Sequence, residues 1–272
     1  MECLRIWLIG GTRDSAEVAR GLVEAEIPCV VTVTTPAATR LYPQAPTLTV
    51  RVGKLTREQL FTFVVDESIG AVLDASHPFA VEISHGAIAT AQQHHLPYLR
   101  LERPPITLEA SDTEATVTEV PDLGTLLANG SLQGERVLLT LGYRSLGACR
   151  PWHQHITLFA RILPSTTALT AAFAAGFTAD RLIALRPPIS PDLERALWQQ
   201  WQITTVVSKA SGQAGGEDTK RQVAAQLGIP LLIVARPQVA YPRQTDSVAE
   251  ALTICQHWSQ IFRSRSNNHP LE

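Results

Sequence analysis

Short apolar runs alternate with amphipathic stretches along the first part of the chain. Aliphatic and β-branched residues gather in brief segments, and each is followed by a stretch with apolar residues at helical spacing, as in Ala16, Val18, Ala19 and Leu22. The expected strands are 5–9, 29–34, 47–51, 71–74 and 97–101, and the expected helices are 14–25, 56–66 and 79–94. Strands that alternate with helices are typical of a parallel sheet covered on both faces.

The same alternation returns after a less regular segment, 104–134. That segment contains an expected edge strand, 116–120, a short helix, 121–128, and a linker near 129–134. The second series has expected strands at 136–141, 156–162, 181–185, 204–207 and 231–235, and expected helices at 143–149, 165–175, 190–201 and 217–227. We therefore expect an α/β fold of two doubly wound parallel-sheet domains, 1–130 and 131–246, a terminal helix, 247–262, and a flexible tail, 263–272.

Composition narrows the class of protein. The 272 residues are 45% hydrophobic and 18% charged, with a formal net charge of -2, which argues against a disordered chain and against a basic protein that coats nucleic acid. No apolar run approaches the ~18–20 residues of a membrane span. The four cysteines lie far apart without a C-x-x-C pair, so we expect neither disulfides nor a metal site, and we expect a cytoplasmic protein.

A glycine turn follows the first expected strand. Gly10, Gly11, Thr12, Arg13 and Ser15 stand between that strand and the next helix, where backbone N–H groups and the helix dipole favour an anion. The pattern lacks the third glycine of a G-x-G-x-x-G fingerprint, and an ordinary tight turn is the alternative.

The second expected strand ends at Thr34 without the carboxylate that NAD-selective folds usually place there. With Arg13 and Arg40 in the neighbouring segments, this favours NADPH over NADH, and NADH stays open.

A second polar segment follows the fourth expected strand: Asp74, Ala75, Ser76, His77, Pro78 and Phe79. Helix capping by Ser76 and a first-turn Pro78 account for two of these residues structurally. They do not account for Asp74 and His77 in the same turn, and a histidine there can donate or carry a proton at neutral pH.

Cations close four strands of the second series. Arg161, Arg186, Lys209 and Arg236 end successive strands, and Arg144 follows the first strand of the series. Parallel strands bring these ends to one edge, where arginine can grip carboxylates with paired hydrogen bonds. Ser211 and Gly212 add backbone donors in the same region. We expect a cradle for a polyanion, and a solvated rim in an arginine-rich chain is the alternative.

These residues together resemble the precorrin-6A reductases of cobalamin (vitamin B12) biosynthesis. The matching motifs are Gly10-Gly11-Thr12, Asp74–Ala80 with Ile83-Ser84, 97–104 (PYLRLERP), Val207–Gly212, and 228–237, and they are distributed over residues 8–237, which is most of the chain. The chain departs from the family at Ser76, where threonine is common, and at Gln213, where a second glycine is common.

The resemblance implies two Rossmann-like domains facing across a cleft, with NADPH or NADH between them. It implies reduction of one double bond of precorrin-6A, or of its cobalt complex, to the 6B form. On this basis Gly10, Gly11, Thr12, Arg13, Ser15, Thr34, Asp74 and Ser76 are cofactor candidates, and His77 shapes the floor of the site. Phe79, Arg144, Arg161, Arg186, Lys209, Ser211, Gly212 and Arg236 are the substrate candidates.

Several alternatives stay open at this point. The chain could bind a nucleotide or tetrapyrrole without turnover, or act on a sugar nucleotide through the same glycine turn. Cobalt in the substrate, the proton donor (water or a substrate carboxyl) and the oligomeric state are not fixed. The expected partner is a polycarboxylate tetrapyrrole, with neighbouring cobalamin-pathway enzymes as further candidates and with neither nucleic acid nor membrane.

Overall fold

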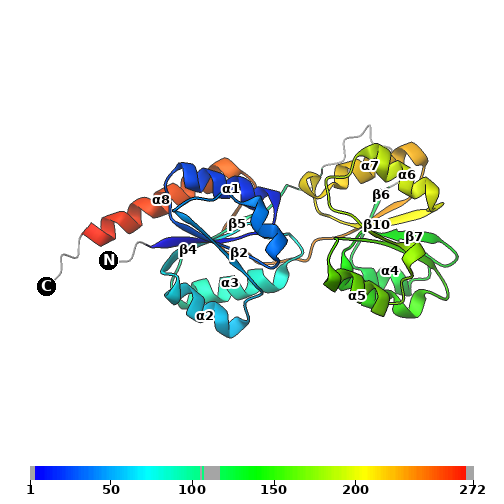
Figure 1. The fold of residues 1–272 in the computed structure, drawn as a ribbon, viewed down its shortest axis with the longest axis horizontal. Helices are drawn as coiled ribbons and strands as arrows, with labels where there is room; N and C mark the ends of the chain where they lie inside the picture. Colours follow the sequence, from blue (N-terminus) through cyan, green and yellow to red (C-terminus); the bar gives the residue numbers. More distant parts are fainter. Residues whose placement is uncertain (1–3, 105, 107–116, 268–272) are drawn as a thin grey trace. The chain divides into compact units, whose positions relative to one another are not determined.

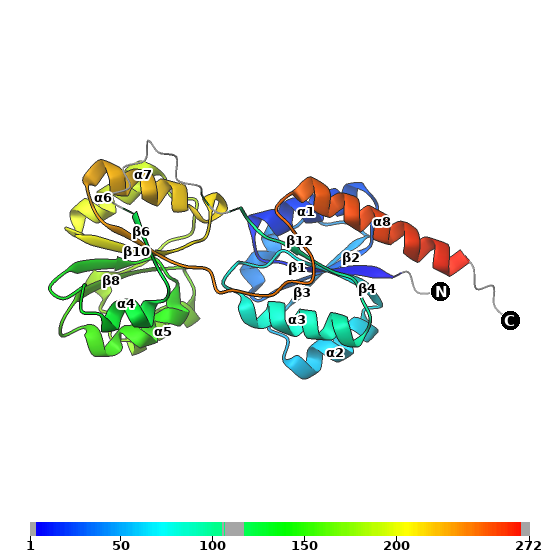
Figure 2. The same cartoon turned by 180° about the vertical axis from the view of Figure 1, so that it is seen from behind.

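The computed structural model describes residues 4–104, 106 and 117–267. The chain divides into two compact units (Figures 1 and 2), one formed by Met1–Pro104 together with Pro237–Glu272, the other by Pro105–Arg236. We call them unit 1 and unit 2. The chain thus leaves unit 1 once and returns to it near its end.

Unit 1 is built on a six-stranded sheet in the order β12-β5-β4-β1-β2-β3. Its strands are β1 (Arg5–Ile9), β2 (Cys29–Val33), β3 (Leu48–Val52), β4 (Ile69–Asp74), β5 (Tyr98–Leu101) and β12 (Gln244–Thr245). All neighbouring strands pair in parallel. The first five strands follow the order of the nucleotide-binding Rossmann fold, and the sixth is supplied by the returning chain.

Helices cover both faces of this sheet, as expected for a parallel sheet that is buried on both sides. They are α1 (Arg13–Glu24), α2 (Arg57–Asp66), α3 (Val81–Gln93) and α8 (Val248–Asn267), with a short 3-10 helix η1 (Pro36–Leu41) after β2. Figure 1 shows α1 and α8 on one face and α2 and α3 on the other. Leu8 and Trp258 belong to the core under α1 and α8, and Trp7 and Phe63 belong to the core on the opposite face.

Unit 2 repeats the plan with the order β6-β11-β10-β7-β8-β9. Its strands are β6 (Val117–Val120), β7 (Arg136–Leu139), β8 (Thr157–Ile162), β9 (Leu182–Ala184), β10 (Thr205–Lys209) and β11 (Leu231–Val234). Its helices are α4 (Leu123–Ala128), α5 (Thr166–Ala174), α6 (Pro191–Gln200) and α7 (Glu217–Leu227), with 3-10 helices η3 (Tyr143–Trp152), η4 (Ala179–Arg181) and η5 (Gln213–Gly215). Here α6 and α7 lie on one face and α4 and α5 on the other (Figure 2).

Each sheet has one point where the strand order reverses. In unit 1 this point lies between β1 and β4, whose last residues Ile9 and Asp74 are register partners. In unit 2 it lies between β7 and β10, where Leu139 pairs with Val207. Ligands of open α/β sheets bind outside the carboxyl ends of the strands at such switch points. The loops that follow these four strands are therefore the places where function is expected.

The predicted fold class is confirmed, but the bounds of the two units differ from the predicted domains. Residues 117–128 belong to unit 2 because β6 pairs with β11, whereas β12 and α8 belong to unit 1. The terminal helix runs to Asn267, so 263–267 are helical and not a tail, and 268–272 lie outside the described residues. The short helix predicted at 143–149 is the longer 3-10 helix η3.

Candidate active site

The glycine turn of unit 1 leads from β1 straight into α1. Thr12 is the N-cap of α1, and its side chain accepts from Ser15 N while Ser15 Oγ accepts from Thr12 N, which closes a capping box. Gly11 has φ +97°, which favours glycine, and a Cβ placed on it would meet nothing within 4 Å. The turn is therefore rigid at its base, and open space lies above Gly11.

Tyr42, which was not among the residues selected from the sequence, contacts this turn from the end of η1. Its Oη accepts a hydrogen bond from Gly11 N at 2.6 Å and lies 2.7 Å from Ser15 Oγ. A Cβ on Gly10 would lie 2.2 Å from that same Oη and 2.8 Å from Val31 Cγ1, so Tyr42 is the reason that position 10 is glycine. Burial raises the pKa of the phenol, which stays protonated at neutral pH. No local sequence signal marks a residue 31 positions away from the turn.

The end of β2 presents its side chains to solvent. Thr34 follows the strand and is exposed, and Arg40 in the last turn of η1 is exposed as well. Arg13, the first residue of α1, is also exposed. The preference for NADPH that was predicted from this segment stays a prediction.

Asp74 has a structural position and not a ligand-facing one. The residue is 0% exposed, and its two carboxylate oxygens accept from Ser76 N, Arg100 Nη1, Ser84 Oγ and Tyr98 Oη at 2.6–3.0 Å. A carboxylate with this many donors is already satisfied. We therefore correct the prediction that Asp74 contacts the cofactor: it holds the loop that follows β4.

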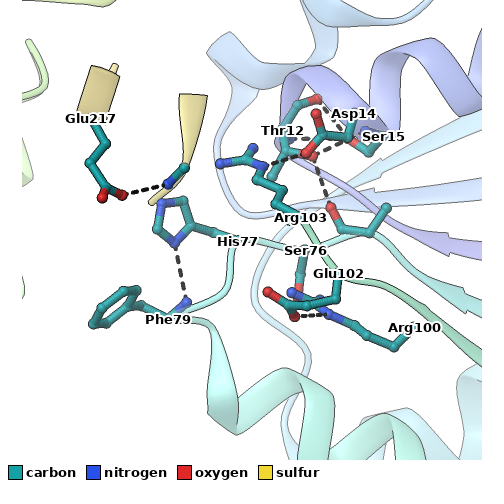
Figure 3. A network of polar contacts seen from close by, with 12 residues as sticks. Thr12, Asp14, Ser15, Ser76, His77, Phe79, Arg100, Glu102, Arg103 and Glu217 are labelled. Carbon is teal, nitrogen blue, oxygen red and sulfur yellow. Dashed lines mark hydrogen bonds and ion pairs between the residues drawn. The ribbon is translucent and has the colours of Figure 1, made fainter. Parts of the chain in front are cut away.

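That loop carries Ser76, His77 and Phe79 (Figure 3). Ser76 is buried, and its Oγ accepts from Arg100 Nη1 at 3.0 Å. His77 is half-buried, and its Nδ1 accepts from the backbone N of Phe79 at 3.2 Å. A neutral His77 with an accepting Nδ1 carries its proton on Nε2. Phe79 is half-buried too, with its ring centroid 5.9 Å from that of His77.

The two loops at the switch point of unit 1 are bonded to each other. Thr12 Oγ1 donates to the carbonyl of Ala75 at 2.8 Å, and Ala75 N donates to Ile9 O. Figure 3 also shows Arg103, after β5, paired with Asp14 in the first turn of α1. The structure thus brings together Gly10–Ser15 and Ala75–Phe79, two segments that the sequence analysis had selected independently.

The predicted cations of unit 2 lie along one sheet edge but in different environments. Lys209 ends β10 at the switch point and is half-buried. Its burial lowers its pKa, and the positive charge of the neighbouring Arg144 adds to this effect. Arg144 is exposed, with its guanidinium 5.9 Å from the centre of the Tyr143 ring. Arg186 is exposed beyond β9, and Arg236 donates from Nε to Ala210 O at 2.7 Å.

Arg161 differs from the other cations because it is already paired. It lies within β8, and its Nη1 forms an ion pair with Glu194 of α6, which is 1% exposed and also accepts from Trp198 Nε1 at 3.2 Å. A guanidinium that neutralises a buried carboxylate is less available to a substrate. Arg161 is thus placed at the predicted edge but has an internal partner.

The loop after β10 is closed by its own helix. Gly212 N donates to Glu217 Oε2 at 2.9 Å (Figure 3), and Lys220 Nζ donates to the carbonyls of Gly215 and Gly216 at 3.4 and 2.9 Å. Burial, and after it the positive charge of Arg161, lowers the pKa of Lys220 to about 8. The two backbone donors predicted here are therefore already used within the fold: Ser211 N donates to Lys209 O at 2.7 Å, and Gly212 N donates to Glu217.

Within 4–104, 106 and 117–267 no three His, Cys, Asp or Glu residues gather as a metal site. Over the same ranges no helix has the length and apolar character needed to cross a bilayer.

Comparison with known proteins gives consistent matches over most of the chain. The family model described as precorrin-6x reductase CbiJ/CobK matches residues 5–256. A cobalt-precorrin-6A reductase of Synechocystis sp. is 48% identical over 254 residues, covering 92% of this chain and 95% of the relative. A precorrin-6A reductase of Rhodobacter capsulatus is 30% identical, over 86% of this chain and 89% of that protein. The solved structure of a CobK precorrin-6A reductase superposes with a TM-score of 0.76 at 25% identity, over 94% of this chain and 97% of that one. The protein therefore belongs to the precorrin-6A reductase family.

Proposed function

We propose that the protein uses NADPH, bound at the switch point of unit 1, to reduce one carbon–carbon double bond of cobalt-precorrin-6A, whose carboxylates bind at the carboxyl edge of unit 2. As a member of its family the protein is an oxidoreductase of cobalamin biosynthesis. The bound dihydronicotinamide would supply a hydride to one carbon of the double bond, and the other carbon would take a proton from water or from a substrate carboxyl. The protein's own residues bind, orient and screen the reactants.

The residues of unit 1 fit a dinucleotide phosphate. Gly11 leaves open space above the turn, and the capping box directs the first N–H groups of α1 toward it. The N–H of Gly11 is held by Tyr42, so the N–H groups of Arg13 and Asp14 are the donors that we assign to the phosphates. His77 and Phe79, on the adjacent loop, provide the surface for the nicotinamide.

NADPH is proposed over NADH on the character of the β2 end. A carboxylate there would bind the ribose 2′-hydroxyl and repel a 2′-phosphate. The segment instead offers the Thr34 hydroxyl with the exposed Arg40, and Arg13 follows the glycine turn. Arginine pairs well with phosphate through parallel N–H groups.

The switch point of unit 2 fits a polycarboxylate better than a second nucleotide. Lys209 and Arg144 lie there as neighbouring cations whose mutual repulsion an anionic ligand would relieve. Arg236 extends positive charge to the neighbouring strand β11, and Arg186 extends it to the edge strand β9, which β8 separates from β7. Arg161 becomes the least favoured of the predicted substrate ligands because of Glu194.

One observation carries the proposal: the same sheet plan occurs twice, with a glycine turn at one switch point and neighbouring cations at the other. The test follows nicotinamide absorbance with purified protein and either cobalt-precorrin-6A or metal-free precorrin-6A. We expect substrate-dependent oxidation of NADPH, faster with the cobalt form because the 48% identical relative carries that name. Binding without oxidation would indicate a carrier, and oxidation only with NADH would reject the proposed cofactor.

Metal-free precorrin-6A is the second candidate substrate. The precorrin-6A reductase of Rhodobacter capsulatus and the cobalt-precorrin-6A reductase of Salmonella typhimurium are each 30% identical to this chain, so identity at this level does not favour either substrate. The two units facing each other across a cleft, the cytoplasmic location and an association with neighbouring pathway enzymes stay predictions.

A further inference from the structure

We propose that Arg100 is a positioning residue for the reduction: through Asp74 and Ser76 it holds the loop that carries His77 in the conformation that the reaction uses. The inference rests on the proposed function, because it takes the His77 loop to face the reacting ring of the cofactor. Arg100 itself is buried and touches neither reactant in this account.

Arg100 is bonded to two residues at the start of this loop, Asp74 and Ser76, just before His77. Its Nη1 donates to Asp74 Oδ1 at 2.9 Å and to Ser76 Oγ at 3.0 Å. The side chains of Arg100 and Asp74 are 1% and 0% exposed, so water does not compete for either. Ser76 N donates to the same Asp74 Oδ1 at 3.0 Å, which fixes the backbone direction just before His77.

The other carboxylate oxygen of Asp74 is fixed from two further elements. Ser84 Oγ of α3 donates to Oδ2 at 2.6 Å and Tyr98 Oη of β5 donates to it at 2.7 Å. Burial, together with the Asp74 charge, raises the pKa of Tyr98, so the phenol remains a donor. Asp74 therefore cannot rotate to follow Arg100 without breaking these bonds.

Arg100 also contacts both segments by which the chain leaves and re-enters unit 1. Its Nε donates to Glu102 Oε2 at 2.8 Å, two residues before the boundary at Pro104. Its guanidinium lies 5.2 Å from the ring centre of Tyr241, in the returning segment, and its backbone N donates to Arg243 O. One buried side chain is thus common to the His77 loop and to the two connections.

Stability alone does not explain such a group. Removing two charges from water is costly, and apolar residues of similar volume often stabilise a fold as well as a buried ion pair does. The charged pair also fixes the orientation of the groups around it, because its polar atoms hydrogen-bond to defined partners. One of these partners is Ser76, the residue before His77.

The experiment compares Arg100→Lys and Tyr98→Phe with Arg5→Met. Arg5 forms a partly buried ion pair with Glu67, 2.7 Å apart, at the amino end of β1. Arg5→Met therefore removes an arginine–carboxylate pair of the same unit, but at the amino ends of the strands and not at their carboxyl ends. We expect Arg100→Lys to lower kcat about tenfold to a hundredfold and Tyr98→Phe about threefold to tenfold, with NADPH KM within about threefold. Arg5→Met should keep kcat within about twofold while lowering thermal stability.

A second readout does not depend on turnover. The ring resonances of His77, followed by NMR through a pH titration and assigned with His77→Gln, should shift or broaden in both network variants and stay unchanged in Arg5→Met. Folded network variants with the wild-type kcat or the wild-type His77 resonances would overturn the positioning role. A wild-type protein that does not oxidise NADPH would instead overturn the proposed function, and the NMR comparison would still decide whether Arg100 holds the loop.

Discussion

Tyr42 shows how one side chain defines the local backbone at the glycine turn. Its hydroxyl accepts from Gly11 and contacts Ser15, and its position leaves no room for a Cβ at Gly10. In many dinucleotide-binding turns the second glycine allows the backbone to approach the pyrophosphate. Here the first glycine of the pair serves the packing of a tyrosine, and Gly11 keeps the open approach.

Replacement of Tyr42 by phenylalanine should weaken cofactor binding without unfolding unit 1. The change removes one neutral hydrogen bond from Gly11 N, so we expect the KM for NADPH to rise about threefold to tenfold with kcat within about twofold. Steady-state kinetics with the cofactor varied measures this. Thr90→Val is the matched control, because Thr90 is buried in α3 and its Oγ donates to Gly86 O at 2.9 Å, away from the turn. An unchanged KM in Tyr42→Phe would show that the tyrosine only fills space.

At the scale of an element, the carboxyl edge of the unit 2 sheet contains cations of two kinds. Arg144 and Arg186 are exposed, and Lys209 is half-buried beside Arg144. Arg161 belongs to an internal group with Glu194, and that group reaches Lys220 through electrostatic interaction. The spacing of cations at strand ends does not distinguish these kinds, because the pairing partner comes from another element, α6.

Two arginine variants should therefore affect different properties, Arg161→Ala the stability of the fold and Arg186→Ala the binding of the macrocycle. Arg161→Ala leaves Glu194 buried without its cation, so we expect the free energy of unfolding to fall by about 3–5 kcal/mol in urea denaturation. Arg186→Ala should leave that free energy within about 0.5 kcal/mol but raise the macrocycle KM about fivefold to fiftyfold. If Arg161→Ala is as stable as the wild type and loses only macrocycle binding, then Arg161 is a substrate ligand as first predicted.

At the scale of the whole molecule, buried thiols link the stability of both units to pH. Burial raises the pKa of Cys29, Cys149 and Cys255 from 9.0 to about 12, and these residues are distributed over both units. A thiol whose pKa is higher in the folded state stabilises the fold below its unfolded pKa, and that contribution is lost as pH rises through the folded pKa. The contribution of Lys220 to the pH dependence of stability has the opposite sign. Its pKa in the folded state is about 8, below the ordinary value of 10.5, so it increasingly stabilises the fold as pH rises between these two values.

We expect the three thiols to outweigh the two lysines whose pKa values are lowered by burial, Lys209 and Lys220. The free energy of unfolding should hold up to about pH 9 and then fall by as much as about 1.4 kcal/mol per pH unit for each thiol. Urea denaturation at about pH 8, 9 and 10 measures this. A variant with all three cysteines replaced by alanine should be less stable but should show a flatter pH dependence. A wild-type stability that rises steadily above pH 9 would contradict the assignment of the thiols as the dominant groups.

The sequence by itself determined the repeated α/β plan and most of the elements. Apolar runs such as 5–9 and 204–207 are strands because a strand buried on both faces must be apolar along its length, and the helix predicted at 14–25 is α1 because apolar residues at helical spacing are a local pattern. The glycine turn, the His77 segment and the cations at strand ends were also found in this way. Each depends on neighbours within a few residues, which the linear pattern contains.

Only the tertiary structure decided which distant segments come together. The last strand and helix return to unit 1, and β6 joins unit 2, because strand pairing is settled by packing and not by order along the chain. Tyr42 reaches a turn 31 residues before it, Asp74 faces Arg100 and not a ligand, and Arg161 meets Glu194 33 residues later. A residue's type shows what chemistry it can perform, and its burial and partners determine whether that chemistry is free for a substrate or is used within the fold.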